Sequence, residues 1–130
     1  MHSCRFVLFG VFVALGLGCS SAPSAPDPSD PESGRELLNK ALDAWKRGDS
    51  HEAYKQAAPS VTVIEPAWKS GTKLIDYEIA AGHEPAGYNV RFKVTLNQQD
   101  AGGGSPKKQK VLYNVCTTPA LVVNRAEGSW

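Results

Sequence analysis

Two His-Glu dipeptides offer the first candidate chemistry in this sequence of 130 residues. His51-Glu52 and His83-Glu84 both begin like the HExxH motif, in which two histidines one helical turn apart hold a zinc ion. The residues at the fifth positions are a lysine and a glycine, so neither dipeptide supplies the second histidine. The sequence therefore predicts no metal site.

A glycine run and a lysine cluster share the segment between residues 98 and 108. Gly102 to Gly104 lacks the GxxxxGK[ST] arrangement, and Lys107 has no predicted strand before it and no helix after it, so no phosphate-binding loop is expected. The whole chain has 14 Lys+Arg against 13 Asp+Glu, a net charge of +1. Because nucleic-acid binding depends on a basic surface, this balance predicts no nucleic-acid partner, and no motif indicates a cofactor.

Aromatic side chains are the candidate binding residues. Trp45 falls on the apolar side of a predicted helix, Trp68 falls in a turn, and Tyr77 and Tyr113 fall in predicted strands. The four residues could line a ligand pocket. The alternative is that they pack in the core, where aromatic side chains bury large areas.

The N-terminus predicts export. Arg5 and the terminal amine form a short positive region, and the 13 residues from Phe6 to Gly18 are uncharged and apolar. A membrane-spanning helix needs about 20 such residues, whereas a secretory signal has an apolar core of about 7–15 residues followed by small ones. Residues 1–18 are therefore interpreted as a signal peptide.

The run ALGLGC, residues 14–19, resembles the lipobox of bacterial lipoproteins, although Gly16 and Leu17 replace the usual leucine and small residue. The resemblance implies that Cys19 receives a diacylglyceryl group and becomes the first residue after cleavage. It also implies a location in the cell envelope, on the extracytoplasmic side of a membrane, because two acyl chains suffice for stable anchoring. The alternative is an ordinary signal peptide that happens to end in a cysteine.

Residues 19–32 contain the lipidated Cys19 and then a segment rich in Pro and Ser. This segment has no large apolar side chain to offset the entropy of ordering, so we predict a disordered linker. Residues 33–130 suffice for one small domain. Cys4 lies in the signal peptide, so the domain has Cys116 alone and no disulfide, and we expect Cys116 to fill space in a strand.

Two helices are predicted at the start of the domain. Ser33 and Glu36 form a capping-box pattern, and apolar residues then recur at spacings of three and four as far as Trp45. Gly48 ends this helix in the conformation that favours glycine. Asp49 is expected to cap a second helix over residues 50–57.

From residue 61 the apolar period changes to two, which is typical of strands. In the strand that begins at Leu74, the side chains of Ile75, Tyr77 and Ile79 share the face that we assign to the core, so Asp76 is expected to face solvent. Strands are predicted over residues 61–64, 74–80, 88–96, 111–117 and 120–125.

This order predicts an α+β domain in which two N-terminal helices pack on a curved antiparallel sheet of four to five strands. It resembles the cystatin-like rolls, including the cone-shaped ketosteroid-isomerase-like folds. That resemblance implies a possible cavity, in which catalysis would need a carboxylate of tuned pKa that points inward. Because Asp76 is expected to point outward, we predict no catalytic residue and no enzyme.

These observations together predict a membrane-anchored extracytoplasmic lipoprotein with a small non-catalytic binding or scaffolding domain. Its expected partners are the membrane, through the lipid on Cys19, and a protein of the envelope. The alternative function is a small-molecule-binding or enzymatic cone-fold domain that uses an inward carboxylate.

Overall fold

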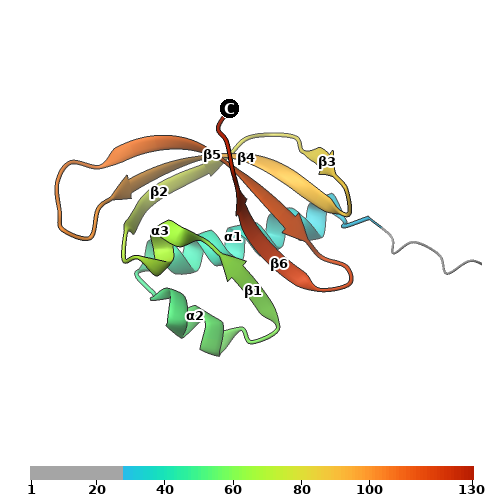
Figure 1. The fold of residues 1–130 in the computed structure, drawn as a ribbon, viewed down its shortest axis with the longest axis horizontal. Coiled ribbons are helices and arrows are strands. Elements are labelled where there is room, and N and C mark those ends of the chain that lie inside the picture. Colours follow the sequence, from blue (N-terminus) through green and yellow to red (C-terminus); the bar gives the residue numbers. More distant parts are fainter. Residues whose placement is uncertain (1–27) are drawn as a thin grey trace, which may run out of the picture.

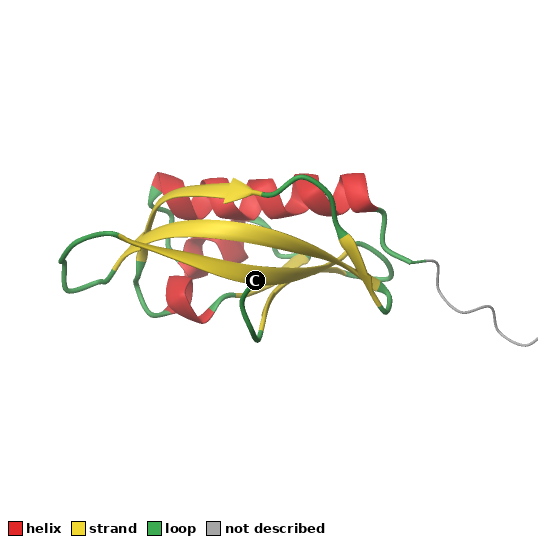
Figure 2. Ribbon diagram, turned by 90° about the horizontal axis from the view of Figure 1, so that it is seen from above, coloured by secondary structure: helices red, strands yellow, loops and turns green. Residues whose placement is uncertain are grey.

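The computed structural model describes residues 28–130, so the predicted signal peptide and Cys19 lie outside the described residues. One long helix lies across one face of a curled sheet, and two short helices lie beside it (Figures 1 and 2). The elements, in chain order, are α1 Pro31–Arg47, α2 His51–Ala57, β1 Val61–Ile64, α3 Pro66–Lys69, β2 Lys73–Ile79, β3 Glu84–Ala86, β4 Asn89–Gln99, β5 Lys107–Cys116 and β6 Leu121–Ala126.

The sheet is mixed, which corrects the prediction of an antiparallel sheet. Its six strands follow the order β1-β6-β5-β4-β2, with the short β3 also paired to β4. Strands β2 to β6 pair antiparallel, but β1 runs parallel to β6, with Val61 opposite Leu121. The alternation of apolar residues shows which face of a strand is buried and carries no information on its direction, so the prediction could not detect this pairing.

Helix α1 begins earlier than predicted. The Asp30 side chain, and not the predicted Ser33, is the N-cap, and it accepts a hydrogen bond from the Ser33 amide at 2.8 Å. Pro31 stands in the first turn, where a missing N–H has no cost. Ser29 is already buried, and its hydroxyl accepts a hydrogen bond from the Thr117 amide at 2.9 Å. The folded part therefore starts inside the range that the sequence assigned to the linker.

The helices differ from the prediction of two helices packed on the sheet. Helix α1 packs against β2, β4, β5 and β6, and its buried side includes Leu38, Ala41 and Trp45. Helix α2 begins after Ser50, not Asp49, has no buried residue, and contacts α1, α3 and β1. Helix α3 occupies the predicted turn around Trp68. The core thus lies between α1 and the concave side of the sheet.

A β-bulge changes the face on which the residues of β2 lie. Leu74 pairs with Gln98 and Asp76 pairs with Asn97, so Ile75 is an extra residue without a partner. Leu74 is buried, whereas 41% of Ile75 is exposed. The prediction that Ile75 lies in the core is therefore wrong, because the extra residue shifts the alternation by one position.

Candidate functional site

A groove opens where α1 ends, between the start of α2, helix α3 and the start of β2. Its volume of about 750 Å³ is in the range of small-molecule sites, which is roughly 300–1,000 Å³. Gly48 ends α1 with a φ of 98° and lets the chain turn sharply into α2, which forms one wall. Gly71, with a φ of 95°, turns the chain from α3 into β2 and forms the opposite wall.

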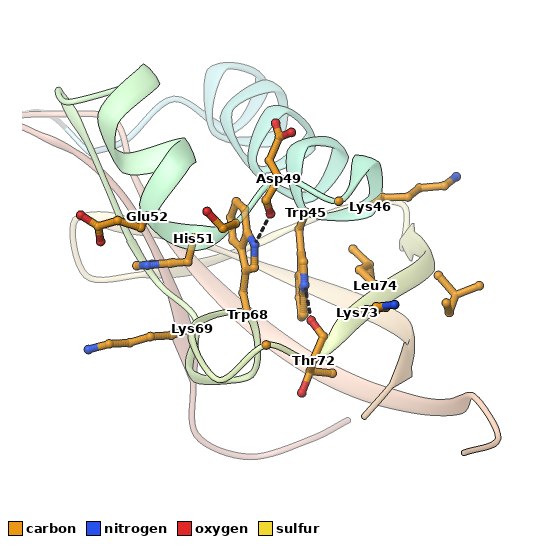
Figure 3. A pocket seen from close by; sticks show the side chains of 14 residues that line it. Trp45, Lys46, Asp49, His51, Glu52, Trp68, Lys69, Thr72, Lys73 and Leu74 are labelled. Atoms are coloured by element: carbon orange, nitrogen blue, oxygen red, sulfur yellow. Dashed lines mark hydrogen bonds between the residues drawn. The ribbon is translucent and has the colours of Figure 1, made fainter. Parts of the chain in front are cut away.

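Two stacked tryptophans form the inner wall of the groove (Figure 3). The rings of Trp45 and Trp68 are 5.8 Å apart and nearly parallel. The Trp45 indole donates a hydrogen bond to the Thr72 carbonyl at 2.7 Å, and the Trp68 indole donates one to the Asp49 carbonyl at 2.8 Å. Because both N–H groups are satisfied by the backbone, the two rings are fixed in place. Both belong to the buried core, with 3% of Trp45 and 4% of Trp68 exposed, so they form a rigid base for the groove and offer it little surface.

His51 is held by its neighbours at the edge of this pair. Its ring meets Trp68 edge-on at 5.5 Å, and its Nε2 lies 2.8 Å from the carbonyl oxygen of Val63. A carbonyl oxygen only accepts, so this nitrogen carries the proton and donates. His51 therefore acts as a structural contact between α2 and β1, in addition to lining the groove.

The charged side chains around the groove are unevenly paired. The Lys46 ammonium lies 3.1 Å from Asp76, and the Arg47 guanidinium lies 2.8 Å from Asp49. Among residues 28–130, Lys73 has no carboxylate within ion-pair distance. In the same range, Lys69 has no carboxylate and Glu52 has no basic group within ion-pair distance. These two residues lie at the opposite end of the groove from Lys73 (Figure 3).

Only two of the four aromatic residues that the sequence predicted to line a pocket lie together in the groove. Trp45 and Trp68 lie together in the groove, whereas Tyr77 and Tyr113 are not among its lining residues. The Tyr77 hydroxyl donates a hydrogen bond to the Asp43 carboxylate at 2.5 Å. Partial burial, followed by this bond to Asp43, raises the pKa of Tyr77 above its ordinary value. Tyr77 therefore fastens β2 to helix α1.

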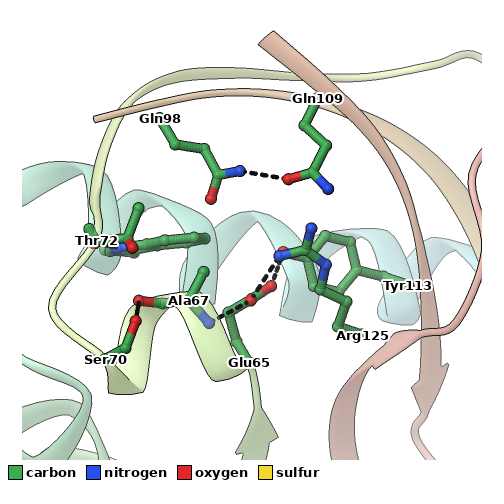
Figure 4. A network of polar contacts seen from close by, with 9 residues as sticks. Glu65, Ala67, Ser70, Thr72, Gln98, Gln109, Tyr113 and Arg125 are labelled. Atoms are coloured by element: carbon green, nitrogen blue, oxygen red, sulfur yellow. Dashed lines mark hydrogen bonds and ion pairs between the residues drawn. The ribbon is translucent and has the colours of Figure 1, made fainter. Parts of the chain in front are cut away.

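Tyr113 belongs to a closed polar cluster inside the molecule (Figure 4). Its hydroxyl donates a hydrogen bond to the buried carboxylate of Glu65. That carboxylate also accepts hydrogen bonds from the Ala67 amide at 3.0 Å and from the Arg125 guanidinium at 2.9 Å. Burial, followed by the charge of Glu65, raises the pKa of Tyr113 well above its ordinary value of 10.0. We call Glu65, Tyr113 and Arg125 the Glu65 cluster.

Sequence reasoning missed Glu65 as the inward carboxylate. The residue considered for that role was Asp76, which is exposed and accepts hydrogen bonds from Lys46 and from the Tyr77 amide. These two hydrogen bonds, that of Lys46 first, lower the pKa of Asp76. One local signal was available for Glu65: it stands directly before Pro66, as the N-cap of a short helix. Nothing local showed that its partners lie in β5 and β6.

Comparisons with known proteins give no relative of this chain. No protein-family model matches the sequence, and the comparisons with curated proteins and with solved structures likewise give no match. Within the described range 28–130, no helix is long and apolar enough to cross a membrane. In that same part of the chain, no three His, Cys, Asp or Glu side chains are grouped so that they could hold a metal ion.

Proposed function

We propose that the protein is a lipid-anchored component of the cell envelope whose domain binds a ligand on the extracytoplasmic side of a membrane. The observation that carries the anchor is the junction Gly18-Cys19, at the end of an apolar run of 13 residues. Such a run is too short to span the bilayer and suits a cleaved signal. A diacylglyceryl group on Cys19 would provide two chains, enough for stable attachment.

The distance between the anchor and the domain supports this arrangement. Ser29 is a buried residue of the domain and stands ten residues after Cys19 in the sequence. A Pro-rich segment extends about 3 Å per residue, so these ten residues would reach about 30 Å. In this proposal the segment holds the domain clear of the lipid surface, with its groove accessible from the aqueous side.

The buried side chains favour a binding role over a catalytic one. The likeness to cystatin-like and ketosteroid-isomerase-like rolls rests on α1 lying across a curled sheet, and an enzyme of that type would need a free inward carboxylate. The inward carboxylate here, Glu65, is engaged by three donors, one of them the cation of Arg125. A carboxylate whose oxygens are engaged in this way is not free to contact a ligand. The groove beside Trp45 and Trp68 is the open surface, and we propose that the ligand binds there.

Intact-mass measurement of the protein made in a bacterial host tests the anchor. The wild type should lose residues 1–18 and gain the mass of acyl chains, and it should enter the detergent phase on partitioning. Cys19→Ala should gain no acyl mass. Cys116→Ala removes the domain's own thiol and is the matched control, so it should be lipidated like the wild type. Wild-type protein without acyl mass would refute the anchor.

A further inference from the structure

We propose that the groove beside Trp45 and Trp68 binds a small organic monoanion, with the apolar body of the ligand against Ile75 and the tryptophans and its anionic group at Lys73. This inference rests on the binding part of the proposed function and names the ligand class. It does not depend on the lipid anchor.

The apolar half of the site is built by the β-bulge in β2. The extra residue in β2 leaves Ile75 with 41% of its surface exposed beside the groove, whereas the preceding Leu74 is buried. Bulges commonly re-aim a side chain next to a functional site. The buried rings of Trp45 and Trp68 lie behind this surface, and their N–H groups are already bonded to the backbone. The exposed side of Ile75 above this rigid base therefore suits a small apolar group that forms no hydrogen bond.

The charged half of the site follows from the pairing around the groove. The lining contains Lys46, Lys69 and Lys73 with the carboxylates of Asp49 and Glu52, so these ionised side chains sum to one positive charge. Asp49 is neutralised by Arg47, which lies outside the lining. Glu52 and Lys69 lie at the same end of the groove (Figure 3); no ion pair joins them, but their opposite charges leave that end without a net charge.

The opposite end keeps the positive charge. Lys46 and Lys73 lie there together (Figure 3), and Asp76 neutralises Lys46 at 3.1 Å. Lys73 follows Gly71 and Thr72 at the start of β2, and in the described part of the chain no carboxylate lies within ion-pair distance of its ammonium group. One unneutralised ammonium next to apolar surface complements a ligand with one negative charge. A cation would meet the wrong sign at this end.

The test compares 2-naphthoate with its neutral analogue 2-naphthamide by titration calorimetry. The full-length protein is held in one non-ionic detergent throughout, so that partition of the probes into micelles is the same for every variant. We expect one naphthoate site per chain and an affinity about three- to fivefold lower for naphthamide, because an exposed ion pair contributes up to about a fivefold change in affinity.

Four variants locate the site. Lys73→Gln should weaken naphthoate binding about three- to fivefold and leave naphthamide binding unchanged. Ile75→Asp should weaken both probes about tenfold or more, because it places a charge on the apolar wall. Lys69→Gln, at the end shared with Glu52, and Lys40→Gln, outside the groove lining, should each change naphthoate binding less than about twofold. Thermal unfolding of each variant confirms that the domain is folded.

The possible failures separate the two proposals. If neither probe binds to the folded wild type, or if Ile75→Asp binds both as the wild type does, the groove is not the binding site. The binding part of the proposed function is then wrong together with this inference, whereas the lipid anchor is tested separately. If naphthamide binds as tightly as naphthoate, or if Lys69→Gln has the effect expected of Lys73→Gln, the binding role stands and the assignment of the anion to Lys73 is wrong.

Discussion

The Glu65 cluster and the Trp45–Trp68 groove both involve helix α3, since Glu65 is its N-cap and Trp68 lies within it, but they differ in how their polar groups are paired. In the cluster, a carboxylate, a phenol and a guanidinium satisfy one another inside the molecule. In the groove, the N–H groups of the buried tryptophans are satisfied by the backbone, while the side chain of Ile75 and the Lys73 ammonium remain exposed. Polar groups whose hydrogen bonds and charges are satisfied within the protein stabilise the fold, whereas an unpaired charge at the surface is available to a ligand.

The sharpest way to break this comparison is to remove the charge of Glu65. Glu65→Gln keeps the shape but leaves the Arg125 guanidinium, with 16% of its side chain exposed, without its ion partner. Breaking a buried pair in this way costs about 3–5 kcal/mol, which urea unfolding would measure as a lower midpoint with an unchanged slope.

Glu52→Gln is the matched control for this change, because Glu52 is exposed on α2. Its free energy of unfolding should stay within about 0.5 kcal/mol of the wild type. If Glu65→Gln were as mild as Glu52→Gln, the cluster would contribute little to stability and the contrast with the groove would fail.

Two adjacent residues test the border between core and groove. Leu74→Ala removes a buried side chain and should cost about 2–5 kcal/mol, whereas Ile75→Ala should cost less than about 1 kcal/mol because Ile75 is half exposed. Chemical unfolding of the two variants side by side gives the comparison. A larger loss for Ile75→Ala would place Ile75 in the core and contradict the bulge.

Sequence patterns could predict the strands whose alternation is uninterrupted. In β4 the buried residues Val90, Phe92, Val94 and Leu96 are those that the period of two selects. The same rule failed at Ile75, because a bulge depends on the register with the neighbouring strand. It also could not join Glu65 to Arg125, 60 residues apart, because a local pattern does not identify distant partners.

The candidate site was predictable to a similar extent. Trp45 and Trp68 lie together beside the groove, and both are buried in the core, which agrees with the alternative that these aromatics pack in the core. Tyr77 and Tyr113 were misassigned because a hydroxyl near a carboxylate finds a partner inside the protein, as these two do with Asp43 and Glu65. No feature of the sequence alone distinguishes such a tyrosine from one that faces a ligand.

Alkaline pH sharpens the comparison at Tyr113. Its pKa is raised in the folded protein, so the stability linked to its protonated form is complete below about pH 10 and is lost as the pH rises through the folded value. Above about pH 10 the free energy of unfolding of the wild type should therefore fall more steeply than that of Tyr113→Phe, by up to about 1.4 kcal/mol per pH unit.

At pH 7 the same variant should be less stable than the wild type by about 1–3 kcal/mol, because Glu65 loses a donor. Unfolding curves recorded at pH 7, 10 and 11 give both quantities. Parallel pH dependences for wild type and Tyr113→Phe would show that the hydroxyl ionises equally in the folded and unfolded states. That result would contradict the burial of Tyr113 beside Glu65.

The smallest expected effect on stability is at Lys73, in the groove. Lys73→Gln should change the free energy of unfolding by less than about 0.5 kcal/mol, because Lys73 is exposed and its charge has no partner in the described range. Thermal and urea unfolding would detect a larger change. A loss above about 1 kcal/mol would make Lys73 part of the framework and not of a binding surface.

The parallel pairing of β1 with β6 also governs when the domain can assemble. The last strand of the chain occupies an interior place in the sheet, between β1 and β5, and it brings Arg125 to Glu65. Contacts across 60 residues, such as Val61 with Leu121, form late because a long loop must close first. A chain emerging from the ribosome therefore cannot complete this sheet until strand β6, Leu121–Ala126, has emerged. For a protein that we propose to cross a membrane before it folds, this delay keeps the chain in a form that a translocation channel can accept.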